Sequence, residues 1–202
     1  MAQPFYMQYE AEYNGCKNCE DSYQQFLQVY GRMRDPLNGL YYHAYDDSRQ
    51  MFWCDKVTGL SENFWLRAMG WYAMALIDTM EVMPESMACQ KARLNAIYKE
   101  LIDAMLPYQD QATGMWYQVV NRGGIAPNYL EESGSAIFAY AIMKAYGSIT
   151  FPRIILNTAK RHLTVYAAHT SPKKTAVSSW AASAWLPGWA TRTCGRALLN
   201  II

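Results

Sequence analysis

Two tryptophans and an arginine, Trp65, Arg67 and Trp71, lie within seven residues of one another. The surrounding segment is patterned as a helix, and Arg67 and Trp71 are four residues apart, so they share one helical face. Indole rings stack on sugar rings, and a guanidinium binds a carboxylate through two parallel hydrogen bonds. These side chains are therefore candidates for binding an acidic sugar. The other interpretation of the run is a buried aromatic helix whose arginine reaches out to water.

Length and composition predict one globular domain without a membrane partner. The chain has 202 residues, enough for a sizeable core, and its 51% hydrophobic residues argue against disorder. No apolar run reaches the ~20 residues that cross a bilayer. The N-terminus also lacks the basic-then-apolar pattern of a signal peptide, which predicts a cytoplasmic location.

Five cysteines in a chain of this length do not indicate a disulfide scaffold. Cys16 and Cys19 form a single CxxC pair, and a zinc site would need two further ligands, whereas Cys54 and Cys89 are isolated. We therefore expect neither a metal nor a cofactor.

The charge is distributed unevenly along the chain. All 17 acidic residues lie at or before Glu132, and residues 133–202 carry eight basic residues and no acidic ones. A basic tail can indicate nucleic-acid binding. Here the charges are diluted among tryptophan, alanine, serine and threonine without a stripe or motif, so we expect no nucleic-acid partner. The other interpretation is that this stretch was never selected as protein.

An internal repeat organises the rest of the chain. The segment from Asp35 to His43 recurs 75 residues later, from Asp110 to Gln118. Each copy has an aspartate, three variable residues, a glycine, an aliphatic residue, two aromatic residues and a polar residue. Aspartate and glycine favour a tight turn, and the aromatic pair favours a short extended piece after it.

A helical pattern precedes and follows each copy of the repeat. The helix after each copy is apolar almost all round, which predicts burial on all sides. The repeating unit is thus an outer helix, a turn, a loop and an inner helix, and the chain is predicted to be all-α, built of helical hairpins. We expect helices at about 18–34, 62–81, 87–107 and 130–147.

Three stretches resemble glycoside hydrolase family 105, the unsaturated rhamnogalacturonyl hydrolases, which are related to the family 88 unsaturated glucuronyl hydrolases. They are His43-Ala44-Tyr45-Asp46, the FWxRxxGWY core from Phe64 to Tyr72, and the WYQV and NYLExSxSA motifs between Gly114 and Tyr140. The resemblance implies an (α/α)6 barrel of six helical hairpins, of which this chain holds about half.

The resemblance also implies a reaction and a set of binding residues. The implied reaction removes a 4,5-unsaturated uronic acid from pectin-derived oligosaccharides: the vinyl ether is protonated, water adds, and the hemiketal collapses. The implied partner is an unsaturated uronate-containing oligosaccharide. His43, Trp65, Arg67 and Trp71 match the family's substrate-binding positions, and we assign Arg67 to the uronate carboxylate.

No catalytic residue can be carried over from the family. Its general acid/base aspartate lies in a Trp-x-Asp-Gly-x-Tyr segment directly before the stretch that Met1 to Phe5 resembles, which places it upstream of this chain. Two adjacent carboxylate pairs remain, Asp46 with Asp47 and Glu131 with Glu132. Adjacent side chains on a strand or helix point apart, so neither pair is a natural acid/base couple. We expect Asp46 to order the loop after His43, and Glu131 to lie near the start of an inner helix.

The family match ends near residue 148. We expect a partial glycoside hydrolase domain over residues 1–148 and a non-matching, frameshifted tail over 149–202. The chain is then interpreted as a fragment that is inactive by itself. A non-catalytic helical-repeat protein or sugar-binding remnant is the alternative. The oligomeric state is left open.

Overall fold

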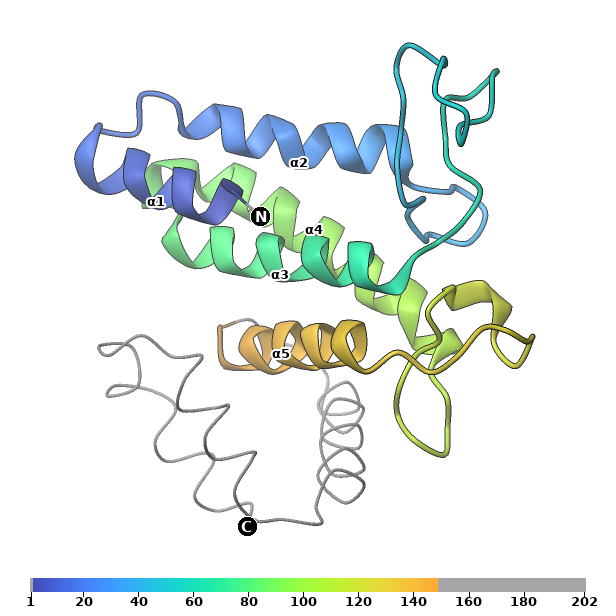
Figure 1. Ribbon diagram of the computed structural model, residues 1–202. Coiled ribbons are helices and arrows are strands. Elements are labelled where there is room, and N and C mark those ends of the chain that lie inside the picture. Colours follow the sequence, from blue (N-terminus) through green and yellow to red (C-terminus); the bar gives the residue numbers. More distant parts are fainter. Residues whose placement is uncertain (1, 149–202) are drawn as a thin grey trace, which may run out of the picture. The chain divides into compact units, whose positions relative to one another are not determined.

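The computed structural model describes residues 2–148, which contain five α-helices and three short 3-10 helices joined by loops (Figure 1). Within these residues no strand forms, and extended segments pair only through isolated bridges. The all-α prediction is confirmed. The predicted tail, residues 149–202, lies outside the described residues. The five helices are α1 (Ala2–Tyr13), α2 (Cys19–Met33), α3 (Leu66–Val82), α4 (Ala88–Met105) and α5 (Glu132–Ser148).

Helix α3 is the centre of the packing, because it contacts α1, α4 and α5. Its sequence is apolar almost all round, as an inner helix requires, and nine of its residues are buried. Figure 1 shows α3 with α1 and α2 on one side and α5 on the other. The predicted antiparallel hairpins are therefore present, and α3 and α5 are the inner helices of two successive units.

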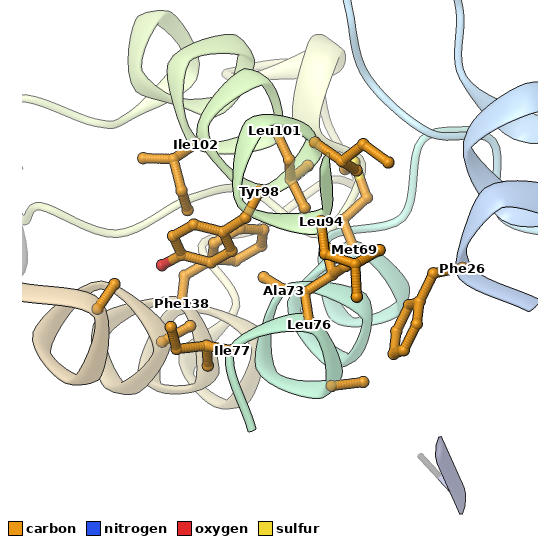
Figure 2. Packing of buried hydrophobic residues seen from close by; sticks show 14 of the residues in the cluster. Phe26, Met69, Ala73, Leu76, Ile77, Leu94, Tyr98, Leu101, Ile102 and Phe138 are labelled. Atoms are coloured by element: carbon orange, nitrogen blue, oxygen red, sulfur yellow. The ribbon is translucent and has the colours of Figure 1, made fainter. Parts of the chain in front are cut away.

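The hydrophobic core joins the two units. Figure 2 shows Phe26 of α2, Met69 and Leu76 of α3, and Tyr98 of α4 among the buried side chains, with Phe138 of α5 beside Tyr98. Most of these side chains are less than 2% exposed. Along α3 the buried residues Met69, Ala73, Leu76 and Met80 are three or four residues apart, which is the periodicity that predicts a helix.

Both copies of the repeat form the same turn. Gly39 N–H donates to the Asp35 carbonyl at 2.9 Å, and Gly114 N–H donates to the Asp110 carbonyl at 2.8 Å. Both glycines have φ above +70°, a left-handed conformation that side chains with a Cβ rarely adopt. The aspartate and glycine of the repeat are therefore fixed by backbone geometry.

A third turn of this kind, which the repeat analysis missed, lies between the two. Gly59 N–H donates to the Asp55 carbonyl at 2.8 Å, and Gly59 has a φ of +79°. Its sequence, Asp-Lys-Val-Thr-Gly-Leu, has the aspartate, three variable residues, glycine and aliphatic residue of the other copies. It lacks the aromatic pair, which is why it escaped notice.

The loops that carry the candidate site gather at one end of the helices. The α2–α3 connection and the α4–α5 connection extend from the same end of the helical layer (Figure 1). They meet through the Trp65–Val119 bridge and through the Leu66 N–H, which donates to the Gln118 carbonyl at 2.9 Å. His43 and the start of α3 are thereby brought to the same end as Trp116 and Tyr117.

Cys16 and Cys19 form a disulfide at the start of α2, a local bond that the sequence interpretation did not predict. Among residues 2–148, no group of three or more His, Cys, Asp or Glu side chains is arranged to hold a metal ion. None of the helices in that range has both the length and the apolar character needed to cross a bilayer.

Candidate functional site

His43, Trp65 and Arg67 lie in one chain of contacts at the loop end. The rings of His43 and Trp65 are 4.3 Å apart between centroids, and the Arg67 guanidinium carbon is 5.8 Å from the centre of the Trp65 ring. Trp65 is the N-cap residue of α3 and has an extended backbone, so it reaches the site from the loop. Arg67 is the second residue of α3 and reaches the site from the helix.

Trp71 lies one helical turn after Arg67 and shares a groove with His43. This groove has a volume of about 480 Å³ and lies among α1, α2, α3 and the start of the α2–α3 loop. Trp71 is 40% exposed, which is unusual for a tryptophan and leaves part of the indole accessible to a ligand. Trp65 and Arg67 are not part of the groove wall. The structure thus connects the four residues through His43, and their role in binding stays a prediction.

Helix α2 contributes groove residues that the sequence interpretation missed. Gln25 and Gln28, together with Gln3 of α1, line the groove beside His43. Amide side chains both donate and accept hydrogen bonds, so they fit a ligand rich in hydroxyl groups. The available signal was the spacing of Gln25 and Gln28, three residues apart on one face of a predicted helix.

Two buried N–H groups at the site have no hydrogen-bond acceptor among the described residues: Trp65 Nε1 and Arg67 Nε. Buried donors are nearly always paired in folded proteins, and leaving one unpaired costs about 1–3 kcal/mol. An acceptor oxygen from a carboxylate or a sugar hydroxyl would pair with either of these N–H donors.

Glu131 supplies the negative charge nearest to Arg67. Its Oε1 lies 3.8 Å from Arg67 Nη2, and its side chain is only 8% exposed. The same carboxylate accepts hydrogen bonds from the Ser133 N–H at 3.1 Å and from the Gly134 N–H at 2.6 Å. Glu131 therefore caps the start of α5, in agreement with the sequence interpretation, and it also holds the arginine.

Gly134 is required where it is because a Cβ at this position would lie 2.7 Å from both Glu131 Oε2 and Leu66 Cγ. We expect Gly134→Ala to lower the free energy of unfolding by about 1–3 kcal/mol, because a well-packed contact must shift. Gly31→Ala is the matched control: Gly31 lies on the exposed face of α2, and an added Cβ there would meet no atom of another element within 4 Å. It should stabilise the chain by about 0.5–1 kcal/mol. Urea denaturation measures both; equal effects would contradict the packing argument.

Partial desolvation lowers the pKa of His43 below its usual value, although the residue remains exposed. The imidazole is therefore neutral at neutral pH, with one nitrogen donating and the other accepting a hydrogen bond. In that state His43 can contact a sugar hydroxyl without placing a second positive charge beside Arg67.

Asp46 orders the loop after His43, as predicted. Its carboxylate accepts hydrogen bonds from the N–H groups of Ser48, Gln50 and Met51. The Met51 N–H and then the Ser48 hydroxyl contribute most to a pKa of about 2. Asp47 points elsewhere and pairs with Arg32 at 2.6 Å. Neither carboxylate is suited to hold a proton near neutral pH.

We expect Asp46 to make the loop sensitive to acid. Its pKa is lower in the folded chain than the ordinary 3.8, so its contribution to stability is present above about pH 4. It is lost as the pH falls from about 4 to 2. The unfolding temperature of Asp46→Asn should lie below that of the parent at pH 6, and the difference should shrink as the pH falls to 2. Asp103→Asn, on the exposed face of α4, is the control; a difference for Asp46→Asn that is constant with pH would contradict the assignment.

Trp116 is fully buried and belongs to the core. Its indole N–H donates to the Met105 carbonyl at 2.8 Å, and its ring lies 5.7 Å from that of Phe138. Trp116 therefore packs behind the turn and is not available to contact a sugar.

Comparison with known proteins gives a consistent family. The family model for glycosyl hydrolase family 88 matches residues 1–177. Protein Atu3128 of Agrobacterium fabrum is 38% identical over 145 residues, 72% of this chain and 60% of that protein. The unsaturated rhamnogalacturonyl hydrolase YesR of Bacillus subtilis is 30% identical over 129 residues, 62% of this chain and 33% of that protein. The family match extends beyond residue 148, and the division of the chain at that residue stays a prediction.

Solved structures agree with the fold. A family 105 glycoside hydrolase of C. acetobutylicum is 38% identical with a TM-score of 0.78, and the match covers 82% of this chain and 46% of that one. The unsaturated glucuronyl hydrolase of Bacillus sp. GL1 is 14% identical with a TM-score of 0.63, over 81% of this chain and 43% of that one, and shares the fold. The described helices therefore form part of a six-hairpin (α/α)6 barrel. The chain spans about half the length of these two solved chains.

Proposed function

The chain belongs to glycosyl hydrolase family 88, and we propose on that basis that its loop end binds the unsaturated uronic acid at the non-reducing end of an oligosaccharide. The observation that carries the proposal is the position of Arg67. Its side chain is 42% exposed and its guanidinium carbon lies 5.8 Å from the centre of the Trp65 ring, while its buried Nε lacks an acceptor among the described residues. A uronate offers both a carboxylate for the guanidinium and a ring for the indole.

The rhamnogalacturonan-derived sugar is the substrate class that we propose within this family. YesR, one of the relatives, is an unsaturated rhamnogalacturonyl hydrolase. The neutral imidazole of His43 and the amides of Gln25 and Gln28 face the same groove as Trp71. They would accept and donate hydrogen bonds to the hydroxyl groups of such a sugar.

The reaction implied by the resemblance needs a proton at C4 of the vinyl ether and a water at C5, after which the hemiketal collapses and releases the second sugar. One general acid/base must deliver the proton and activate the water. Two described carboxylates at this end of the helices, Asp46 and Glu131, are already held by backbone N–H groups. Asp46 is held by three backbone N–H groups, and Glu131 caps α5.

We therefore propose that the 202-residue chain binds its sugar without turning it over. General acid/base catalysis contributes a factor of about 10²–10⁴ to the rate, and the hydrogen bonds that hold Asp46 and Glu131 leave neither carboxylate suited to supply it. The intrinsic fluorescence of the purified chain should change saturably on addition of unsaturated galacturonyl-rhamnose, because Trp65 and Trp71 lie at the site. Over the same period the vinyl-ether absorbance should stay constant.

Two controls separate the possible results of this experiment. Unsubstituted rhamnose should leave the fluorescence unchanged, because it lacks the carboxylate that Arg67 binds. If the vinyl-ether absorbance falls and Asp46→Asn or Glu131→Gln stops the fall, the chain is an active hydrolase and the proposed binding-only role is wrong. If neither signal changes, the proposed ligand is wrong.

A further inference from the structure

We propose that Glu131 is a positioning residue for the uronate site: it holds the Arg67 guanidinium beside Trp65 so that the arginine meets the sugar carboxylate in one orientation. This inference rests on the function proposed above. Sequence patterns place Glu131 in a motif that begins a helix, and nothing in that motif links it to an arginine 64 residues earlier.

The carboxylate of Glu131 is itself held rigidly. Oε1 accepts hydrogen bonds from the Ser133 N–H and the Ser133 hydroxyl, at 3.1 and 2.7 Å, and Oε2 accepts one from the Gly134 N–H at 2.6 Å. The Glu131 N–H donates to the Trp116 carbonyl at 2.9 Å, so the backbone of the residue is fixed as well. The nearest Glu131 oxygen to Arg67 is thus attached to a helix start and not to a flexible loop.

The orientation of the Arg67 side chain, in contrast, depends on contacts with other residues. An arginine side chain at the surface loses rotamer freedom when it is fixed, and a ligand that has to fix it binds more weakly for that reason. The described contacts of the guanidinium are the Glu131 carboxylate just before α5 and the Trp65 ring just before α3. Together they restrict the guanidinium while 42% of the side chain remains exposed for a ligand.

A competing effect predicts the opposite result. A buried negative charge 3.8 Å from Arg67 also lowers the positive potential that attracts a uronate. If that repulsion dominated, removing the charge of Glu131 would tighten binding. The guanidinium has five N–H donors, and Glu131 is within reach of one terminal nitrogen only, so a second carboxylate still has donors available. We therefore expect orientation to outweigh repulsion.

The experiment uses the full 202-residue chain and measures Arg67 first without any ligand. In the parent, the Arg67 Nε–H resonance should show slow solvent exchange and a rigid heteronuclear NOE. Glu131→Gln should bring both to the values of a mobile surface arginine. Ser133→Ala, which removes one bond to the same carboxylate but keeps its charge and its reach, should leave them near the parent values. Unchanged Arg67 mobility in Glu131→Gln would overturn the proposal.

Binding of unsaturated galacturonyl-rhamnose is the second measurement. Glu131→Gln should weaken it about 2- to 10-fold, and should weaken it no further when Arg67→Lys is already present. The proposal would be overturned if Glu131→Gln bound the sugar more tightly than the parent. It would also be overturned if the losses of affinity caused by Glu131→Gln and Arg67→Lys added up in the double variant. If Glu131→Gln fails to fold, Glu131→Asp, which keeps the charge but withdraws it by one methylene, takes its place and should also release Arg67. A parent chain that does not bind this sugar contradicts the proposed function alone, because the mobility of Arg67 is measured without it.

Discussion

Arg67→Lys should weaken the binding of unsaturated galacturonyl-rhamnose by about 5- to 150-fold, equivalent to about 1–3 kcal/mol. Lysine keeps the positive charge but not the planar fork that binds both oxygens of a carboxylate. It also loses the contact of a flat guanidinium with the Trp65 ring, now 5.8 Å from the Arg67 carbon to the ring centre. Titration of the sugar into each chain, followed by fluorescence or calorimetry, measures the change.

Arg93→Lys is the matched control for this substitution. Arg93 also lies over an aromatic ring, 5.1 Å from the centre of Tyr30, but on α4 and outside the site. Its replacement should leave binding unchanged. Should Arg67→Lys and Arg93→Lys behave alike, charge near the site would be sufficient and the two-pronged contact would be ruled out.

The helices could be predicted from the sequence wherever burial leaves a regular pattern. The sequence predicted four of the helices, α2 to α5. Their apolar residues either recur every three or four residues or surround the whole helix. Helix α1 was not predicted. Phe5, Tyr9 and Tyr13 are its large exposed residues, and Met7 and Glu10 are its buried ones, so no apolar stripe marks its inner face.

The start of α3 shows why boundaries need the tertiary structure. Its predicted start was near residue 62, whereas the helix begins at Leu66. The preceding residues pair instead with the α4–α5 connection: Val120 N–H donates to the Phe64 carbonyl at 3.0 Å, and Trp65 bridges Val119. Local sequence contains no sign of a partner more than 50 residues away, and this pairing is what aims Trp65 at the site from the loop.

In the candidate site, too, some features could be predicted from the local sequence and others depend on tertiary contacts. Types and spacing singled out Trp65, Arg67 and Trp71, because chemistry was visible in three side chains close together in the sequence. The ion pair between Glu131 and Arg67 could not be predicted from the sequence, because it depends on how α5 packs against α3. A family resemblance identifies the positions that touch a ligand more readily than the residues that orient them.

Trp116→Ala should lower the free energy of unfolding by about 3–5 kcal/mol, the largest effect on stability that we predict. The side chain is fully buried and packs against Phe138, and its N–H satisfies the last carbonyl of α4, at Met105. Its own backbone N–H and carbonyl bind Ser135 and Glu131 at the start of α5. Urea denaturation monitored by circular dichroism measures the loss.

Trp71→Ala should have the reverse profile. The indole is 40% exposed, so its loss should cost little stability, but it removes the ring that faces the groove shared with His43. A base stacked on an aromatic side chain contributes about 1–3 kcal/mol; taking the same range for a sugar on this indole, the affinity for the uronate disaccharide should fall by about 5- to 150-fold. Together the two substitutions distinguish a tryptophan that builds the fold from one that contacts the ligand. If Trp71→Ala unfolds as readily as Trp116→Ala, Trp71 is part of the core, and its proposed role in stacking on the sugar is wrong.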